Sequence, residues 1–331
     1  MARRTKRIPP NYFASGFGLA GLTEVWAIAA DQHRVPPGVS TGLSVLAALV
    51  WLGVLIAYFA HLLLVDRKVL KQDLVNPVTG PFLSLALITP MLLAVLGIFP
   101  HAPTAGKTVF DVFLVLTVLL GGWFTGQWII AGPELDQIHP GYFLPTVAGG
   151  LIASDAAAVT GQHRLAELMF GYGMICWLVL GSVILTRLFT RPLPPSPLMP
   201  TLAIEIAPAA VASLAWFDAH NDGVDAVASG LAGYGLLMIL VQVRLLPIYV
   251  RLPFMPSTWS FAFAWAAVAA AGLHWLGALR PTGYAAWEWV VIVAITVLTG
   301  AIAVRSLIDV TRWFIGPEAA EPAEQKAAQP A

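Results

Sequence analysis

Charged residues are scarce in this chain. Only 11% of its 331 residues are Asp, Glu, Lys or Arg, whereas 58% are hydrophobic and the mean hydropathy is +0.78. A soluble domain has about 25% charged residues, so this chain lacks the polar surface that a water-soluble protein of its size needs. Its formal net charge is zero, which gives no indication of a nucleic-acid partner.

Cysteine, lysine and histidine are missing from the places where a cofactor would need them. The single cysteine, Cys176, lies inside an apolar run, which excludes a disulfide or a cysteine-based metal site within one chain. No lysine lies inside such a run, which excludes a retinal Schiff base, and no two of the seven histidines stand three or four residues apart. No nucleotide-binding loop or nucleophile motif is present. We therefore expect no cofactor, no bound metal and no enzymatic activity.

The apolar residues form ten runs of about 20 residues, the length that crosses the apolar core of a bilayer. Each run must be helical, because an open strand in lipid leaves its backbone groups unpaired. The sequence predicts an all-α integral membrane protein, with a basic N-terminus at 1–10, a transmembrane domain at 11–308 and a disordered tail at 309–331. The ten predicted spans are 11–30, 41–64, 81–99, 109–131, 142–158, 165–189, 201–217, 224–246, 258–278 and 285–308.

Lys and Arg are distributed unequally between the two sides of this arrangement. With both termini in the cytoplasm, the outer side holds only Arg34, Lys107, Arg164 and Arg280. Such a bias places the basic side in the cytoplasm and supports an even number of spans. The cytoplasmic side then holds Arg3, Arg4, Lys6, Arg7, Arg67, Lys68, Lys71, Arg187, Arg191, Arg244, Arg251, Arg305, Arg312 and Lys326.

Odd and even spans differ in their use of proline. Even spans are long, uniformly apolar and almost free of it, whereas odd spans open with a proline and three carry an internal one, namely Pro90, Pro145 and Pro208. An internal proline frees a backbone carbonyl, which a membrane tolerates where neighbouring helices or a cavity satisfy it. We predict five hairpins with quasi-five-fold symmetry, the odd helices around a central pore and the even helices against lipid.

Two carboxyls lie well inside odd spans. Glu24 belongs to the first span and Glu205 lies about one turn inside the seventh. A charge at the centre of a membrane helix costs about 2.5–3.5 kcal/mol on insertion scales and is a functional candidate by default. Both are candidates for the conduction path, although a protonated or hydrogen-bonded carboxyl between helices is the alternative. Five other acids lie nearer span ends and are interpreted as solvated: Asp111, Asp155, Glu167, Glu288 and Asp309.

The ninth span opens with bulky rings separated by small residues, Trp259-Ser-Phe261-Ala-Phe263-Ala-Trp265. Apolar rings can gate a pore by excluding water from it, although ordinary packing is the alternative. Successive helical residues turn by about 100°, so Phe261 and Phe263 point about 160° apart and cannot both face one axis. Trp259 and Phe263 share a face.

The chain resembles the tellurite-resistance/dicarboxylate transporter family, which includes bacterial TehA, fungal malate permeases and plant slow anion channels. The resemblance runs from about Pro10 to Ile308. It rests on the order and spacing of several segments, which are 12–21, 76–82, 139–145, 170–174, 206–209 and 259–263.

This resemblance implies a ten-helix protomer with an axial pore lined by the odd helices, assembled as a homotrimer in the bacterial inner membrane. It also implies that Phe263 occludes the pore, with Phe261 as the second choice. Two features depart from the family pattern. Ala264 stands where plant-type members have proline, and Glu24 and Glu205 stand where members mostly carry uncharged residues.

The leading hypothesis is therefore an anion channel or channel-like permease whose partners are small inorganic or organic anions and the lipid bilayer. Because an ionised carboxylate in the pore would repel anions, a second hypothesis is a proton-coupled carrier of C4-dicarboxylates or related oxyanions, linked to tellurite resistance. A membrane-embedded redox enzyme or sensor is the third.

Overall fold

The computed structural model describes residues 7–32, 34–220 and 223–315. In these ranges all regular structure is helical, and ten helices are long and apolar enough to cross a membrane. The prediction of ten spans is confirmed to within a few residues at each end. The spans are Pro10–Asp31, Gly38–Leu64, Gly80–Ile98, Pro103–Ala131, Pro140–Val159, His163–Thr190, Ser196–Ala219, Ala226–Tyr249, Pro256–Leu279 and Tyr284–Thr311.

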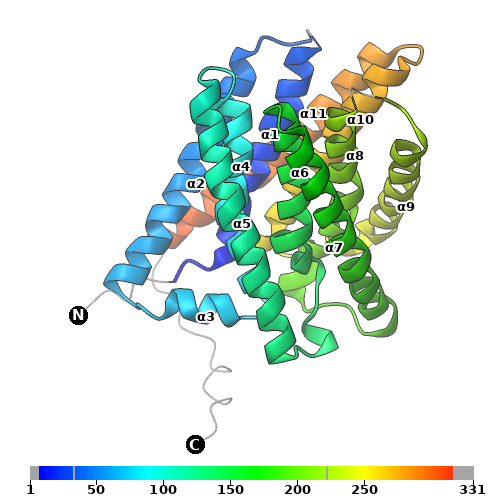
Figure 1. The fold of residues 1–331 in the computed structure, drawn as a ribbon. Helices are drawn as coiled ribbons and strands as arrows, with labels where there is room; N and C mark the ends of the chain where they lie inside the picture. Colours follow the sequence, from blue (N-terminus) through cyan, green and yellow to red (C-terminus); the bar gives the residue numbers. More distant parts are fainter. Residues whose placement is uncertain (1–6, 33, 221–222, 316–331) are drawn as a thin grey trace, which may run out of the picture.

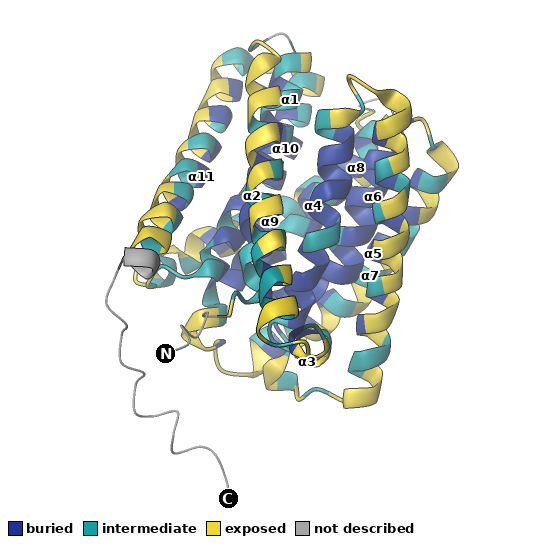
Figure 2. Ribbon diagram, turned by 90° about the vertical axis from the view of Figure 1, so that its left-hand side faces the viewer, coloured by how far each residue is buried: buried dark blue, intermediate teal, exposed yellow. Residues whose placement is uncertain are grey.

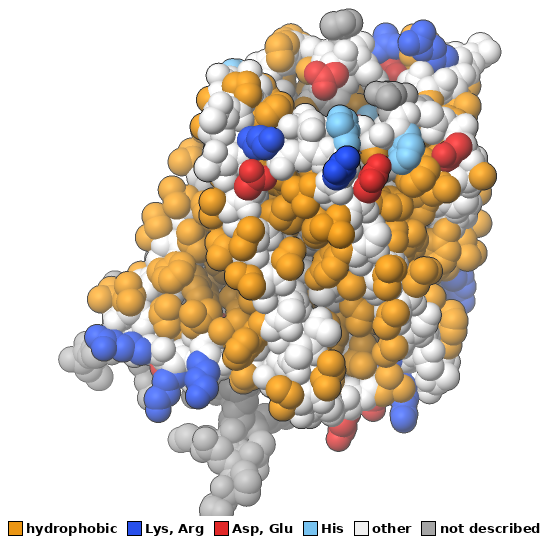
Figure 3. Space-filling model, in the orientation of Figure 1, with side chains coloured by type: hydrophobic (Ala, Val, Ile, Leu, Met, Phe, Trp, Pro, Cys, Tyr) orange, Lys and Arg blue, Asp and Glu red, His pale blue; other side chains and the backbone are white. Residues whose placement is uncertain are grey.

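The helices stand side by side with their charged residues towards the two ends (Figures 1 and 3). Helix α3 crosses one end of the bundle, which is called the α3 end below. The α-helices are α1 (Phe13–Asp31), α2 (Gly38–Leu64), α3 (Val69–Val75), α4 (Leu85–Leu93), α5 (Pro103–Ala131), α6 (Gly149–Val159), α7 (His163–Thr190), α8 (Ala207–Ala219), α9 (Ala226–Tyr249), α10 (Trp259–Leu279) and α11 (Tyr284–Ile315).

Burial separates the odd spans from the even ones. The odd spans are 50–89% buried inside the protein, whereas the even spans are 17–28% buried and expose large apolar side chains. In Figure 2 the buried residues gather on α4, α6 and α8, while the outer faces of α2, α5 and α11 are exposed. The predicted division into inner and outer helices is confirmed, and the five-fold symmetry stays a prediction.

The inner spans depart from α-helical geometry at their prolines. Each of them opens with a 3-10 segment in which proline occupies one of the first two positions, where its missing N–H costs least. Pro90 lies inside α4, and the π-helical turn Ala94–Ile98 follows one turn later. Pro145 is the second residue of another π-helical turn, Leu144–Ala148, directly before α6.

Neighbouring groups satisfy carbonyls that these prolines release. Pro90 cannot donate to the carbonyl of Ala86, and the indole Nε1 of Trp51 on α2 donates to it instead at 3.0 Å. Pro208 would leave the carbonyl of Ile204 free, and the N–H of Ala207 donates to that oxygen within the 3-10 geometry. An outer helix thus stabilises a break in an inner one.

His139 holds the third and fifth spans together at the α3 end. Its Nδ1 accepts from the N–H of Gly141 at 3.1 Å, so its Nε2 donates to the carbonyl of Val78 at 3.0 Å. Burial lowers the pKa of His139 to about 4. The ring is therefore neutral at physiological pH, and the tautomer is fixed by the two hydrogen bonds.

One acid interpreted as solvated is an ion-pair partner in the structure. Glu288 is 1% exposed and its Oε2 lies 2.6 Å from Nε of Arg34, which tethers the start of α11 to the loop after α1. Burial near a span end requires a partner of opposite charge, and the sequence could not show that Glu288 and Arg34 would meet.

The predicted end of the membrane domain at residue 308 falls inside α11, and residues 316–331 of the predicted tail lie outside the described residues.

Helices α6 and α7 pack backbone to backbone through glycine. A Cβ placed on Gly173 would lie 2.8 Å from Cγ and 2.9 Å from the backbone nitrogen of Leu151. Small residues allow this close approach, from which membrane helices gain their packing energy.

We expect Gly173→Ala to lower the melting temperature in detergent, because a backbone atom of α6 stands where the new methyl group would go. Overpacking of this kind costs about 1–3 kcal/mol. Gly171→Ala is the matched control on the same helix, since nothing lies within 4 Å of its Cβ position. Equal melting temperatures for the two variants would contradict the packing.

Candidate conduction pathway

A narrow cavity lies between the inner helices. Its volume is about 40 Å³, room for a few water molecules at most. Every residue that lines it belongs to one of the five odd spans. The prediction that odd helices surround a common axis therefore agrees with the placement of this cavity.

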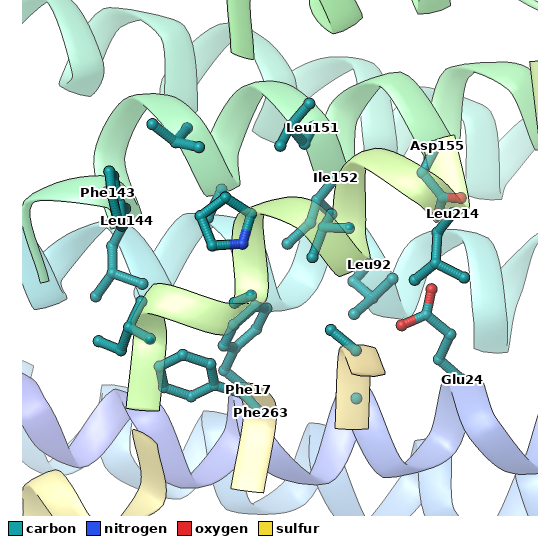
Figure 4. A pocket seen from close by; sticks show the side chains of 18 residues that line it. Phe17, Glu24, Leu92, Phe143, Leu144, Leu151, Ile152, Asp155, Leu214 and Phe263 are labelled. Carbon is teal, nitrogen blue, oxygen red and sulfur yellow. The ribbon is translucent and has the colours of Figure 1, made fainter. Parts of the chain in front are cut away.

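Aromatic rings close one end of the cavity. Phe263 of α10 lies against Phe17 of α1, with ring centroids 5.1 Å apart, and Phe143 lines the same end (Figure 4). Phe263 is only 5% exposed. No hydrated ion fits between rings at this separation, so the structure represents a closed pathway.

Carboxyl groups mark the other end. Glu24 of α1 and Asp155 of α6 point towards each other across the cavity (Figure 4). A second cavity of about 330 Å³ begins there and shares Glu24, Leu92, Asp155 and Leu214 with the first. The second cavity is called the vestibule below. The two cavities form one path, from the Phe17–Phe263 contact to the end of the bundle opposite α3.

The vestibule is unusually acidic for its size. Its lining includes Glu24, Asp31, Asp155 and Asp218, together with His101 and His274. In the described part of the chain no three such side chains come together as a metal site would require.

Asp155 corrects an interpretation made from the sequence. Its position near the end of the fifth span indicated a solvated side chain, but it is 7% exposed and faces the path. Within α6, Asp155 follows Leu151 of the lining by four residues and so shares its face. The π-helical turn before α6 prevented this face from being counted from the start of the span. Asp218 was missed altogether, since it lies at the last turn of α8.

The two predicted carboxyls have different surroundings. Glu24 lines both cavities. Glu205 is 4% exposed, does not belong to the cavity lining, and lies close enough to Tyr234 and Tyr249 of α9 to interact with them electrostatically. Its Oε1 has no hydrogen-bond partner among the described residues. The geometry supports a role in the path for Glu24 and gives none to Glu205.

The ninth span places its rings as helix geometry requires. Phe261 points away from the path and packs against Tyr249 of α9, with ring centroids 4.8 Å apart. Trp259 lies against α1 near Gly18, and its Nε1 donates to the hydroxyl of Ser306 on α11. Only Phe263 of these three lines the cavity.

The predicted kink prolines contribute unequally to the path. Pro208 lines the cavity together with Ile204 and Ala207. Pro90 and Pro145 are buried but do not line it. Their role is to shape the inner helices rather than to contact a solute.

Comparison with known proteins agrees with this arrangement. A family model described as voltage-dependent anion channel matches residues 7–307, nearly the whole chain. The chain belongs to the voltage-dependent anion channel family. It is also 29% identical, over 271 residues covering 79% of each chain, to the tellurite resistance protein TehA homolog of Haemophilus influenzae.

Membership of this family supports anion transport through a multi-pass membrane protein rather than catalysis. It confirms the resemblance seen in the sequence. The carboxyls of the vestibule bear on this function, because a carboxyl that ionises beside an anion path raises the energy of an approaching anion.

We expect Asp155→Asn to increase anion flux into proteoliposomes, because an amide cannot take up the negative charge that a carboxyl in the path acquires when it ionises. Glu205→Gln is the matched control, a second buried carboxyl on an inner span that does not face the path. It should leave folded yield and flux nearly unchanged. Flux that responds to Glu205→Gln and not to Asp155→Asn would contradict this assignment.

Proposed function

We propose that this protein is an anion channel or channel-like permease with its gate at Phe263. The observation that carries the proposal is the cavity within the odd spans, which ends at the contact of Phe263 with Phe17. Family membership supports anions as the transported solutes.

The physical basis of the gate is exclusion of water. The closed end is lined by phenylalanine, leucine and valine side chains, which offer an anion no replacement for its hydration shell. A rotation of the Phe263 side chain removes the obstruction without moving a helix. In the open state, backbone groups at the breaks in the inner helices would supply polar contacts, as non-helical backbone does where it lines a cavity.

We expect Phe263→Ala to raise anion conductance in planar bilayers, because it removes the ring that closes the path. Because the ring is buried and packs against Phe17, the variant should also lose stability, by up to about 3–5 kcal/mol. Current recordings across an anion series, with wild type beside the variant, measure the effect and identify the permeant ion.

Phe261→Ala is the matched control. It deletes a ring two residues away that packs against Tyr249 outside the path. It should lower stability by less than the roughly 3–5 kcal/mol of a fully buried phenylalanine, since Phe261 is only partly buried, and it should not raise conductance. Conductance that rises only in Phe261→Ala would refute the gate.

The vestibule favours a second function, a proton-coupled carrier of C4-dicarboxylates or related oxyanions. Carboxyls that face a transport path can bind and release protons as it opens to each side. Glu24 and Asp155 are the candidates for this coupling. A carrier would show uptake that depends steeply on a pH gradient and loses this dependence in Asp155→Asn, whereas a channel would conduct without a gradient. Because the Haemophilus relative is named for tellurite resistance, growth in tellurite should be compared between strains with and without this protein.

We also propose that the α3 end is cytoplasmic, because the excess of Lys and Arg lies there. The bacterial inner membrane and a homotrimeric assembly are proposed from the family resemblance. Reporter fusions to each terminus should both be active in the cytoplasm, and the purified protein should have three times the mass of one chain. Termini on opposite faces, or a stable monomer in mild detergent, would contradict the respective proposal.

A further inference from the structure

A groove of about 830 Å³ opens on the outer surface at the α3 end, apart from the conduction path. Its apolar walls come from α2, α3 and the second half of α5, and its rim carries Arg67 and Lys71. The residues that line it are Leu62, Leu63, Arg67, Leu70, Lys71, Leu74, Val75, Trp123 and Gln127.

The groove has a fixed floor. The indole Nε1 of Trp123 donates to the carbonyl of Leu74 at 3.2 Å, which joins α5 to α3. On its other side α3 is held by Asp73, whose buried carboxylate pairs with Arg7 and accepts from the hydroxyl of Tyr58 on α2 at 2.7 Å. Arg7 and Tyr58 thus tie α3 to the N-terminal segment and to α2.

The two cations at the rim of the groove take no part in this network. Arg67 and Lys71 are both exposed, and in the part of the chain that the structure describes neither forms an ion pair or a side-chain hydrogen bond. Asp66 beside them accepts from the backbone N–H of Lys68 and from Gln72. Figure 3 shows Lys and Arg side chains gathered at this corner, below a band of exposed hydrophobic side chains.

The groove lies near the end of a membrane span, and this position determines which kind of ligand can bind there. Leu63 and Trp123 are 64% and 52% exposed, close to the point where the membrane span of α2 ends. An occupant therefore meets an apolar surface on the membrane side and two unpaired cations on the aqueous side. Acyl chains below an anionic phosphate have this distribution of charge, and basic pockets between helices on the cytoplasmic side bind such head groups.

We propose that this groove is a binding site for an anionic phospholipid of the leaflet at the α3 end. The phosphate pairs with Arg67 and Lys71, and an acyl chain lies along Leu63, Leu70 and Trp123. The site stands on these contacts alone and does not depend on which solute the protein transports. Bound lipid would hold α3 against α2 and α5, and so steady the 3-10 segment Gly80–Ser84 that begins the third span directly after α3.

The test uses the full-length protein in mild detergent, titrated with phosphatidylglycerol or phosphatidylcholine, with retained lipid counted by native mass spectrometry. Wild type should retain phosphatidylglycerol preferentially. The double variant Arg67→Gln, Lys71→Gln should lose this preference by about tenfold or more, since each cation near an anionic head group contributes about 1 kcal/mol. Both residues are exposed, so the variant should fold, and its melting temperature without lipid checks this.

The matched control is Arg244→Gln, Arg251→Gln, which removes two exposed cations from the same end of the bundle, on and just after α9. It should keep the wild-type preference. Equal retention of the two lipids by wild type, or equal losses in the two double variants, would overturn the proposal. A second copy of the chain in the groove would also overturn it, and would appear as a disulfide-linked dimer of Leu63→Cys made in a Cys176→Ser background.

Discussion

The structure depends on one constraint, that no water is available inside the bilayer to pair with a free backbone group. A span can therefore depart from α-helical geometry only where protein replaces the lost hydrogen bond. The clearest case is Pro90, where the indole of Trp51 on an outer helix donates to the carbonyl of Ala86. Inner helices can be irregular because the outer helices are regular and surround them.

This difference between regular outer helices and irregular inner helices determines where a path can form. Outer helices present leucine and valine to lipid along most of their length, so they offer nothing to a solute. Inner helices carry prolines, glycines and alanines, pack closely with each other, and leave a narrow space between them. That space is closed by rings at one end and bordered by carboxyls at the other, which makes the steric barrier and the electrostatic barrier separate elements on one axis.

The separation explains why the carboxyls do not exclude anion transport. Glu24 and Asp155 lie at the junction of the narrow cavity with the vestibule, away from the contact of Phe17 with Phe263. Under the proposed function, charges at this point would change how often an anion enters, whereas Phe263 would determine whether the path is open at all. A proton bound at the junction would lower the first barrier without affecting the second, so proton dependence is compatible with either a channel or a carrier.

The sequence by itself determined the number of spans and their inner and outer classes, because hydrophobic length and proline usage are local properties. The 100° turn of a helix showed that Phe261 and Phe263 cannot both face the path, and the family resemblance made Phe263 the candidate gate. It did not determine which carboxyls face the path. Ile204 and Glu205 are neighbours in a 3-10 segment, and a π-helical turn precedes Asp155. Such segments change the rotation per residue, so the facing of later side chains cannot be counted from an ideal helix. Only the tertiary packing, which fixed those irregular turns, turned Asp155 towards Glu24 and Glu205 away from the path.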